Sequence, residues 1–253
     1  MTDYDRAVAM WRGRGIKGAA ELAETLNAQC VSFAYHSGKL ENENVTYGDT
    51  REIFDHDGVS AYTGDLRTLF EIRNARDAHE LFLDAFESGR PLDESLVLEF
   101  HKKLMLNTYD ARRWQLGERP GEYKLHDYVT GKMEIGSSPE NAAADMAALL
   151  DELNGTEYRD DRQILTAAAY FHARFENIHP FADGNGRTGR LAMNYFLVLH
   201  RHPPVTIHEE DRGGYYAALE AWDEAQDLNP LLSFLTAQTA KTWAKHVARH
   251  SCP

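Results

Sequence analysis

Residues 179–190 of the chain read HPFADGNGRTGR, and the apolar run LAMNYFLVL follows directly at 191–199. The glycine-rich turn before this run predicts a helix that begins near Gly186. The first turn of such a helix presents unpaired backbone N–H groups and the positive end of the helix dipole, which favour phosphate. Gly184 and Gly186 carry no Cβ, so the backbone can approach an anion closely. The stretch therefore predicts a phosphate-binding turn.

Four charged or titratable side chains surround this turn. Arg187 and Arg190 are three residues apart, so we expect both on one helix face with forked donors for phosphate oxygens. Asp183 offers a hard oxygen ligand of the kind that Mg²⁺ takes together with phosphates. His179 lies on the entering loop, and a neutral imidazole is the usual general base near neutral pH. The set predicts a nucleotide-phosphate site with a proton acceptor at its rim.

Each piece alone also has an ordinary explanation. A histidine before proline is most often a loop residue, a GNG triplet a turn, and two arginines a solvated helix face. Glu176-x-x-His179 resembles half of a di-iron site, but the second Glu-x-x-His that such a site needs is absent from the sequence. The pair His200 and His202 fits a surface loop better than a metal site. The co-occurrence of base, acid, glycines and arginines in this order favours the phosphate site.

Helical periodicity dominates the rest of the chain. Ile164, Ala168, Phe171 and Phe175 fall on one helix face. Ser138 before Pro139 marks the start of another helix. One segment differs, because residues 122–135 are rich in Tyr, Val and Thr around a Thr-Gly pair and predict a short β-hairpin. We therefore expect a mainly α-helical fold with helices around residues 17–36, 64–88, 94–106, 138–155, 160–177, 186–200, 212–223 and 229–248.

Composition limits the classes of function. The 253 residues carry a formal net charge of −13, which argues against broad contact with nucleic acid or an anionic membrane. The cysteines are Cys30 and Cys252, too few for a disulfide framework or a zinc site. The N-terminal stretch lacks the apolar core of a signal peptide, and no apolar run reaches the roughly 18 residues of a membrane span. We expect a cytoplasmic protein.

The stretch HPFADGNGRTGR matches the motif HPFx[D/E]GNGRxxR of the Fic family, which the chain therefore resembles. Typical members of that family transfer AMP from ATP to protein hydroxyls. The resemblance implies an all-α, Fic-type helical bundle with a short β-hairpin flap, for which residues 122–135 are the candidate. It also implies a catalytic domain over residues 61–250, with a core of about 90–240, and an N-terminal helical extension over residues 1–60.

The resemblance assigns roles to the charged residues of the motif. His179 would deprotonate a serine, threonine or tyrosine hydroxyl of a target protein, and Asp183 would hold Mg²⁺ between the α- and β-phosphates. Arg187 would contact the β-phosphate and Arg190 the γ-phosphate. In-line attack on the α-phosphorus of ATP needs positioning, charge neutralisation and a proton acceptor, which agrees with these roles.

The remaining nucleotide contacts are also implied by the resemblance. The backbone of Gly184, Asn185 and Gly186 would form the anion hole. Tyr215 and Tyr216 occupy positions where related proteins contact the adenine base. Aromatic residues at helical spacing are more often part of a core, and both readings stay open at this point.

A second motif lies far upstream. Ser37-Gly-Lys-Leu-Glu41-Asn42 matches [S/T]xxxE[G/N], the inhibitory signature of the Fic family. Ser37 and Glu41 are four residues apart and share a face if the helix extends this far. In the resembling subclass, a helix near residues 20–45 is inhibitory, and its glutamate pairs with the second arginine of the catalytic motif. Here that pair would be Glu41 with Arg190.

Three functions fit the sequence. The first is a protein adenylyltransferase that uses ATP and Mg²⁺ and is autoinhibited by Glu41. The second is a de-AMPylase that uses the same site, with Glu41 orienting a water. The third is a non-catalytic nucleotide-sensing helical module, which the presence of His179 and Asp183 disfavours because phosphate binding alone needs no base. The sequence leaves open the target, self-modification and assembly into a homo-oligomer.

Overall fold

The structure is a computed structural model that describes residues 1–128 and 136–250, and every regular element in these two ranges is a helix. In chain order the helices are α1 (Asp3–Gly13), α2 (Ala19–Glu41), α3 (Tyr47–His56), α4 (Leu66–Glu87), α5 (Glu94–Met105), α6 (Ala111–Gln115), α7 (Pro139–Asn154), α8 (Asp161–Ile178), α9 (Asn185–Leu199), the 3₁₀ helix η1 (Glu209–Asp211), α10 (Arg212–Ala225) and α11 (Asn229–His250).

The junction between α8 and α9 is set by local sequence signals. Asp160 caps α8 by accepting a hydrogen bond from the Gln163 N–H at 2.9 Å. The helix ends at Ile178, because His179 turns left-handed (φ 49°) and Pro180 cannot continue it. Gly184, also left-handed (φ 80°), is the N-cap of α9, which begins at Asn185. The motif loop is therefore a tight connection between two long helices.

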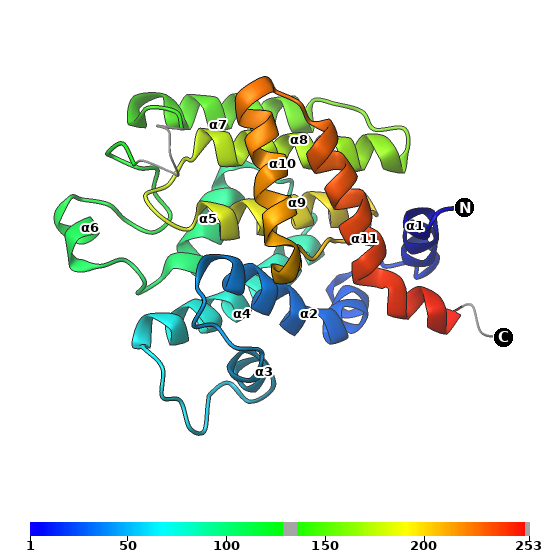
Figure 1. The fold of residues 1–253 in the computed structure, drawn as a ribbon, viewed down its shortest axis with the longest axis horizontal. Coiled ribbons are helices and arrows are strands. Elements are labelled where there is room, and N and C mark those ends of the chain that lie inside the picture. The colour runs from blue at the N-terminus through cyan, green and yellow to red at the C-terminus, as the bar shows by residue number, and fades with distance from the viewer. Residues whose placement is uncertain (129–135, 251–253) are drawn as a thin grey trace.

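Helix α9 lies at the centre of the bundle. It packs against α8, α5, α2 and α4, while α7 and α10 pack on α8 and α1 packs on α11. In Figure 1, α7 and α8 lie along the top, α5 and α9 lie below them, α2 and α4 follow, and α3 lies at the bottom. Met193, Phe196 and Leu197 of α9 are at most 1% exposed. The central position of α9 places its first turn where several helices can contribute side chains.

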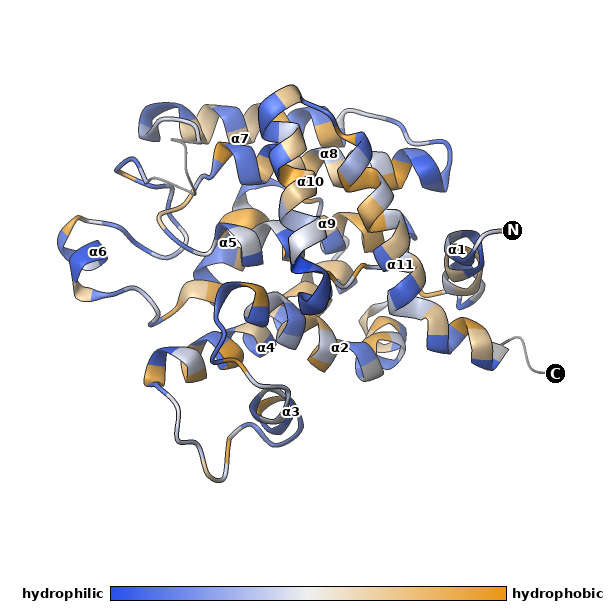
Figure 2. Cartoon of the chain, in the orientation of Figure 1, coloured by the Kyte–Doolittle hydropathy of each residue, from blue (hydrophilic) through white to orange (hydrophobic). Residues whose placement is uncertain are grey.

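The N-terminal helices share this core. Trp11 of α1 packs edge-on against Trp243 of α11, with ring centroids 5.0 Å apart. Leu22 and Leu40 of α2 belong to the same buried cluster as Phe196. Figure 2 shows both hydrophobic and hydrophilic residues along each long helix, as amphipathic packing requires. The predicted division between residues 1–60 and 61–250 remains a prediction.

The all-α prediction is confirmed, and each predicted helix is present within a few residues of its expected ends. The prediction missed α1, α3 and α6. Residues 36–50 contain the end of α2 and the start of α3, which Thr46 caps by accepting a hydrogen bond from the Asp49 N–H at 3.1 Å. Within the predicted hairpin, residues 122–128 form no strand, and residues 129–135 lie outside the described residues. None of the helices in the described ranges has both the length and the apolar character needed to cross a membrane.

Candidate active site

His179 is positioned by the end of α8. Its backbone N–H donates to the Phe175 carbonyl at 3.0 Å, and its side chain is half-buried. Burial, followed by the positive charge of Lys124, lowers the pKa of His179 to about 4. Lys124 is itself buried and is fixed by its backbone N–H, which donates to the Pro180 carbonyl at 2.9 Å. The imidazole is therefore neutral at pH 7 and can accept a proton.

A buried histidine of α5, His101, contacts the motif loop. The ring of His101 stacks on Phe181, with centroids 3.7 Å apart and planes at 4°. The Gly121 N–H donates to His101 Nδ1 at 2.8 Å, so the proton of the neutral ring lies on Nε2, which contacts the Asp183 carbonyl at 3.0 Å. The Asn185 side chain accepts from the Phe181 N–H at 2.9 Å and donates to its carbonyl at 2.8 Å. These contacts fix the path of the loop.

Asp183 lies among three guanidinium groups. Its Oδ1 accepts from the Gly184 N–H at 2.7 Å and lies 3.6 Å from Arg187 Nη2. Its Oδ2 accepts from Arg67 Nη2 at 2.9 Å and lies 3.5 Å from Arg113 Nη2. The carboxylate is thus held by cations from α4, α6 and α9.

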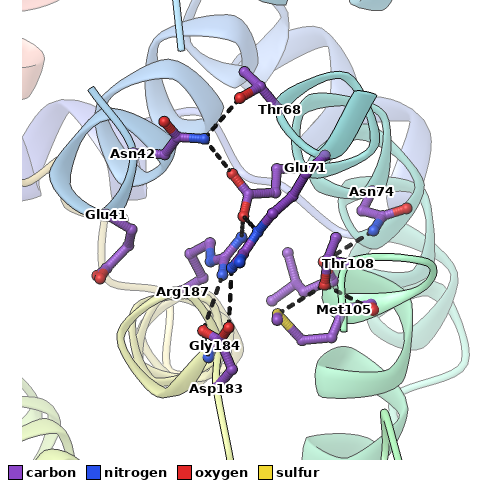
Figure 3. A network of polar contacts seen from close by, with 12 residues as sticks. Glu41, Asn42, Thr68, Glu71, Asn74, Met105, Thr108, Asp183, Gly184 and Arg187 are labelled. Carbon is purple, nitrogen blue, oxygen red and sulfur yellow. Dashed lines mark hydrogen bonds and ion pairs between the residues drawn. The ribbon is translucent and has the colours of Figure 1, made fainter. Parts of the chain in front are cut away.

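Arg187 is held by a buried acid on α4. Its Nη1 lies 3.1 Å from Glu71 Oε1, and the two side chains are 7% and 6% exposed. Arg67 Nε donates to the same oxygen at 3.1 Å. Asn42 Nδ2, at the end of α2, donates to the other carboxylate oxygen at 2.7 Å (Figure 3). Glu71 therefore contacts both Asn42, the last residue of the motif at 37–42, and Arg187, the first arginine of the motif at 179–190.

Arg190 is held by the face of α2 that carries Ser37 and Glu41. Its Nη2 donates to Glu41 Oε1 at 2.8 Å and to the Ser37 carbonyl at 3.0 Å, and its Nε donates to Ser37 Oγ at 3.0 Å. Arg190 is 4% exposed. The structure thus contains the pairing of Glu41 with Arg190 that the resemblance implied.

The glycines of the turn permit two close approaches. A Cβ on Gly186 would collide with Glu41 Oε1, so the carboxylate lies directly against the first turn of α9. A Cβ on Gly184 would collide with Met105 Sδ, and φ at this residue is +80°. The sequence predicted an anion at this turn, and in the structure the anion closest to Gly186 is the protein's own Glu41.

The two tyrosines proposed for the adenine site occupy different environments. Tyr215 is 1% exposed, with its hydroxyl 2.8 Å from His172 Nε2 and 3.5 Å from Arg190 Nη1. Tyr216 is 42% exposed, and its hydroxyl donates to the Leu40 carbonyl at 3.4 Å. Of the pair, Tyr216 is partly exposed to solvent, whereas Tyr215 is buried next to Arg190.

The sequence reasoning did not assign four residues that shape this site. Arg67 and Glu71 carry only the signal of an ordinary i,i+4 ion pair on a helix. His101 gives no signal, since a single histidine on an amphipathic helix has many uses. Lys124 also carries no local signal, and the structure buries it beside His179.

Asp183 offers a single carboxylate to a metal ion, which could join it if the ion arrives already bound to phosphates. Among residues 1–128 and 136–250, no group of three or more His, Cys, Asp or Glu side chains could hold a metal ion. A complete protein cage is therefore absent from this part of the chain. Mg²⁺ commonly takes only one or two carboxylates together with phosphates, and the single carboxylate of Asp183 fits that pattern.

Glu176 on α8 should make stability depend on pH. Its Oε1 is buried with no hydrogen-bond partner among the described residues, and burial raises its pKa from 4.5 to about 8. The folded protein therefore favours the protonated acid, and stability falls as pH rises from about 4.5 towards about 8. We expect Glu176→Gln to stabilise the protein by an amount that grows across this range and then levels off. Urea unfolding at a series of pH values measures it, and a difference independent of pH would contradict it.

Comparison with known proteins shows which family and which relatives the chain is similar to. Residues 91–197 match the model of the Fic/DOC family. A curated relative in Drosophila willistoni, "Protein adenylyltransferase Fic", is 32% identical over 215 residues, which cover 82% of this chain and 40% of the relative. "Protein adenylyltransferase fic-1" of Caenorhabditis briggsae is 25% identical over 227 residues, covering 85% and 41%. The chain thus spans about two-fifths of the length of these relatives.

Solved structures share the fold over nearly the whole chain. A Fic-domain-containing signalling protein from Bacteroides thetaiotaomicron superposes with a TM-score of 0.80 and 24% identity, covering 97% of this chain and 96% of the other. A Fic family protein from Desulfovibrio desulfuricans gives a TM-score of 0.75 and 25% identity, covering 99% and 75%. The arrangement of helices is therefore shared with proteins that contain Fic domains.

Proposed function

The chain belongs to the Fic/DOC family, and on that premise we propose that it is a protein adenylyltransferase, which transfers AMP from ATP to a hydroxyl side chain of a target protein. One observation carries the proposal: a neutral imidazole, a carboxylate and two buried arginines meet around one glycine turn at the start of α9. The curated relatives with the name "Protein adenylyltransferase Fic" support it.

The reaction assigns one task to each group. The hydroxyl oxygen of the target attacks the α-phosphorus of ATP and forms the new O–P bond, while the bond to pyrophosphate breaks. His179 takes the hydroxyl proton, which the neutral ring can accept at pH 7. Arg187 and the N–H groups at the start of α9 bind the phosphates. Asp183 would hold Mg²⁺, which when bound neutralises phosphate charge.

Autoinhibition by Glu41 is part of this proposal. Arg190 cannot bind the γ-phosphate while its guanidinium donates hydrogen bonds to the Glu41 carboxylate and to Ser37. The carboxylate also lies against Gly186, where an anionic ligand would approach. ATP would then bind in a pose unsuited to in-line attack. Residues of α2 supply both the contact to Arg190 and the contact against Gly186. Displacement of α2 would therefore release Arg190 and, at the same time, expose the first turn of α9.

The position of Glu41 also suits removal of AMP. A carboxylate against the first turn of α9 could orient a water towards the phosphorus of a modified target. Water would attack, the target hydroxyl would be restored, and AMP would leave. Incubation of pre-modified target with the wild-type protein and Mg²⁺ tests this second activity through the release of free AMP.

ATP labelled at either the α- or the γ-phosphate tests the transfer itself. With the Glu41→Gly protein, Mg²⁺ and a cell extract, we expect more protein-bound label from α-labelled ATP than in the extract alone, and no such increase from γ-labelled ATP, which the kinases of the extract also use. Incorporation from the γ-position alone would identify a phosphate transferase and overturn the proposal. Saturable ATP binding without incorporation from either label would favour a nucleotide sensor.

Arg67 should compete with Mg²⁺ for Asp183. The contact is half-exposed, so its loss corresponds to about 0.2–1 kcal/mol, which is roughly a 1.4- to 5-fold change. We expect Arg67→Ala to lower, by that factor, the Mg²⁺ concentration that half-saturates ATP binding in calorimetric titrations. Arg51→Ala removes an arginine of a surface ion pair on α3, away from the site, and serves as the control. An unchanged Mg²⁺ requirement in Arg67→Ala would contradict the competition.

A further inference from the structure

A cavity of about 90 Å³ lies behind the helix that carries Ser37 and Glu41. Its walls come from α2, α3, α4 and α9 together with residues 205–207. One face of α2 contributes residues at i, i+3, i+4, i+7 and i+8, beginning with Cys30 and continuing through Phe33 and Ala34. The opposite walls include Ala75 of α4 and Leu191 of α9. The face of α2 that docks on the catalytic helix is therefore incompletely packed.

Two buried polar atoms on residues that line this cavity lack partners. Arg187 Nε and Thr206 Oγ1 have no hydrogen-bond partner within the described ranges, and their residues are 7% and 2% exposed. A buried polar atom without a partner destabilises the folded protein, because it has lost its hydrogen bonds to water. The Arg187 Nε–H can only donate, and the threonine hydroxyl can donate or accept. An oxygen acceptor in the cavity could pair with such a donor.

The cavity is separate from the phosphate-binding turn. It shares Ser37, Glu71, Arg187 and Arg190 with that site, but its lining includes no residue of the segment 179–186 and does not include Glu41. A molecule in the cavity would therefore touch the two arginines without meeting His179 or Asp183. A ligand there need not resemble a nucleotide.

We propose that this cavity binds a small, mainly apolar molecule with one carbonyl or hydroxyl oxygen, and that the ligand holds α2 in its docked position. An apolar cavity of about 150 Å³ accommodates benzene, so this smaller cavity suits a shorter molecule such as a ketone of a few carbons. Because α2 forms one wall, the site is complete only when α2 is docked. A ligand that binds only the docked state must increase its population.

The consequence for activity rests on the proposed transferase function. Docked α2 holds Arg190, so the ligand would lower AMP transfer. At a free concentration of about ten times its Kd, a ligand specific for the docked state favours that state by about tenfold. We expect transfer by the wild-type protein to fall by a similar factor. Transfer by Glu41→Gly should change little, because docking of α2 no longer occupies Arg190 with a carboxylate.

Binding can be measured without any activity, because Cys30 lines the cavity. In a Cys252→Ser protein, the rate of Cys30 alkylation by iodoacetamide is followed as 2-butanone is added. We expect a saturable fall of about tenfold at ten times the Kd, since an occupied cavity excludes the reagent. Ala75→Leu fills the cavity and should remove this dependence, with Ala34→Val as the second filling variant. A rate independent of 2-butanone, or the same dependence in both filled variants, would overturn the site.

The two halves of the proposal can fail separately. Protection of Cys30 without AMP transfer in any variant would leave the ligand site standing and remove the proposed function. Protection together with transfer that 2-butanone leaves unchanged would overturn the coupling to α2. Protection together with inhibition of the wild-type protein, but not of Glu41→Gly, is the result that we expect.

Discussion

Replacement of His179 should abolish AMP transfer and leave ATP binding nearly unchanged. A positioned general base typically contributes about 10²- to 10⁴-fold to a rate, and in this site His179 is the neutral imidazole beside the phosphate turn. The groups proposed to bind phosphate, Arg187 and the first turn of α9, do not depend on its ring. We expect the initial rate of transfer in the Glu41→Gly background to fall by that factor. Labelled ATP measures the rate, and calorimetry measures ATP binding.

The choice of substitution matters because His179 has a left-handed backbone, with φ of 49°. Asparagine adopts this conformation more readily than alanine and is not a base, so His179→Asn tests the chemistry with less strain than His179→Ala. His56→Ala, on the exposed end of α3, is the matched control and should keep full activity. Transfer retained by His179→Asn would exclude the assigned role. Loss of ATP binding in step with transfer would assign His179 to binding instead.

Release of Arg190 should produce the second large effect. The contact from its guanidinium to Glu41 is charge-assisted, and contacts of this kind contribute about 1.5–3 kcal/mol. This range corresponds to roughly 10- to 150-fold in rate. We therefore expect Glu41→Gly to raise the rate of AMP transfer by this factor, because Arg190 loses its carboxylate partner and the γ-phosphate can take that place. The measurement is the initial rate of target labelling at saturating ATP.

Two further variants separate the loss of charge from the added backbone freedom of a glycine. Glu43→Gly introduces a glycine two residues away, at an exposed glutamate 3.8 Å from Arg212, and should leave the rate near that of the wild type. Glu41→Gln keeps the side-chain shape but removes the charge, so it should activate as well. Equal rates for Glu41→Gly and the wild type would refute inhibition by this contact. Activation by Glu43→Gly to the same extent would attribute the effect to a more flexible backbone at the end of α2.

The fold could be predicted largely because its signals are local. The cap at Asp160, the stop at His179-Pro180 and the apolar spacing of α8 all lie within one short stretch. Helices α1 and α3 were missed because each is short and buries few residues, such as Trp11 and Ile53. Their formation depends on partners elsewhere in the chain, which periodicity does not reveal.

The residues of the site also fall into those that local sequence reveals and those that only tertiary packing brings together. His179 through Arg190 are contiguous, so their grouping could be predicted from residue types alone. Arg67 lies 116 residues from Asp183, and nothing local distinguishes its pair with Glu71 from the i,i+4 surface pair of Arg73 with Asp77. Tertiary packing alone buries Glu71 against Arg187.

The contact between Glu41 and Arg190 spans 149 residues. It could be anticipated only from a resemblance to a known motif. The network through Asn42 was not anticipated at all, although Asn42 belongs to that motif.

The central claim is that His179 and Arg190 serve one pocket in which ATP gives up AMP to a protein hydroxyl. Mass spectrometry of a lysate treated with the Glu41→Gly protein, ATP and Mg²⁺ tests it most directly, with the Glu41→Gly, His179→Asn double variant in parallel. The account predicts serine, threonine or tyrosine side chains with the mass of one added AMP in the first sample and none in the second. Modification by a different group, or equal modification in both samples, would contradict it.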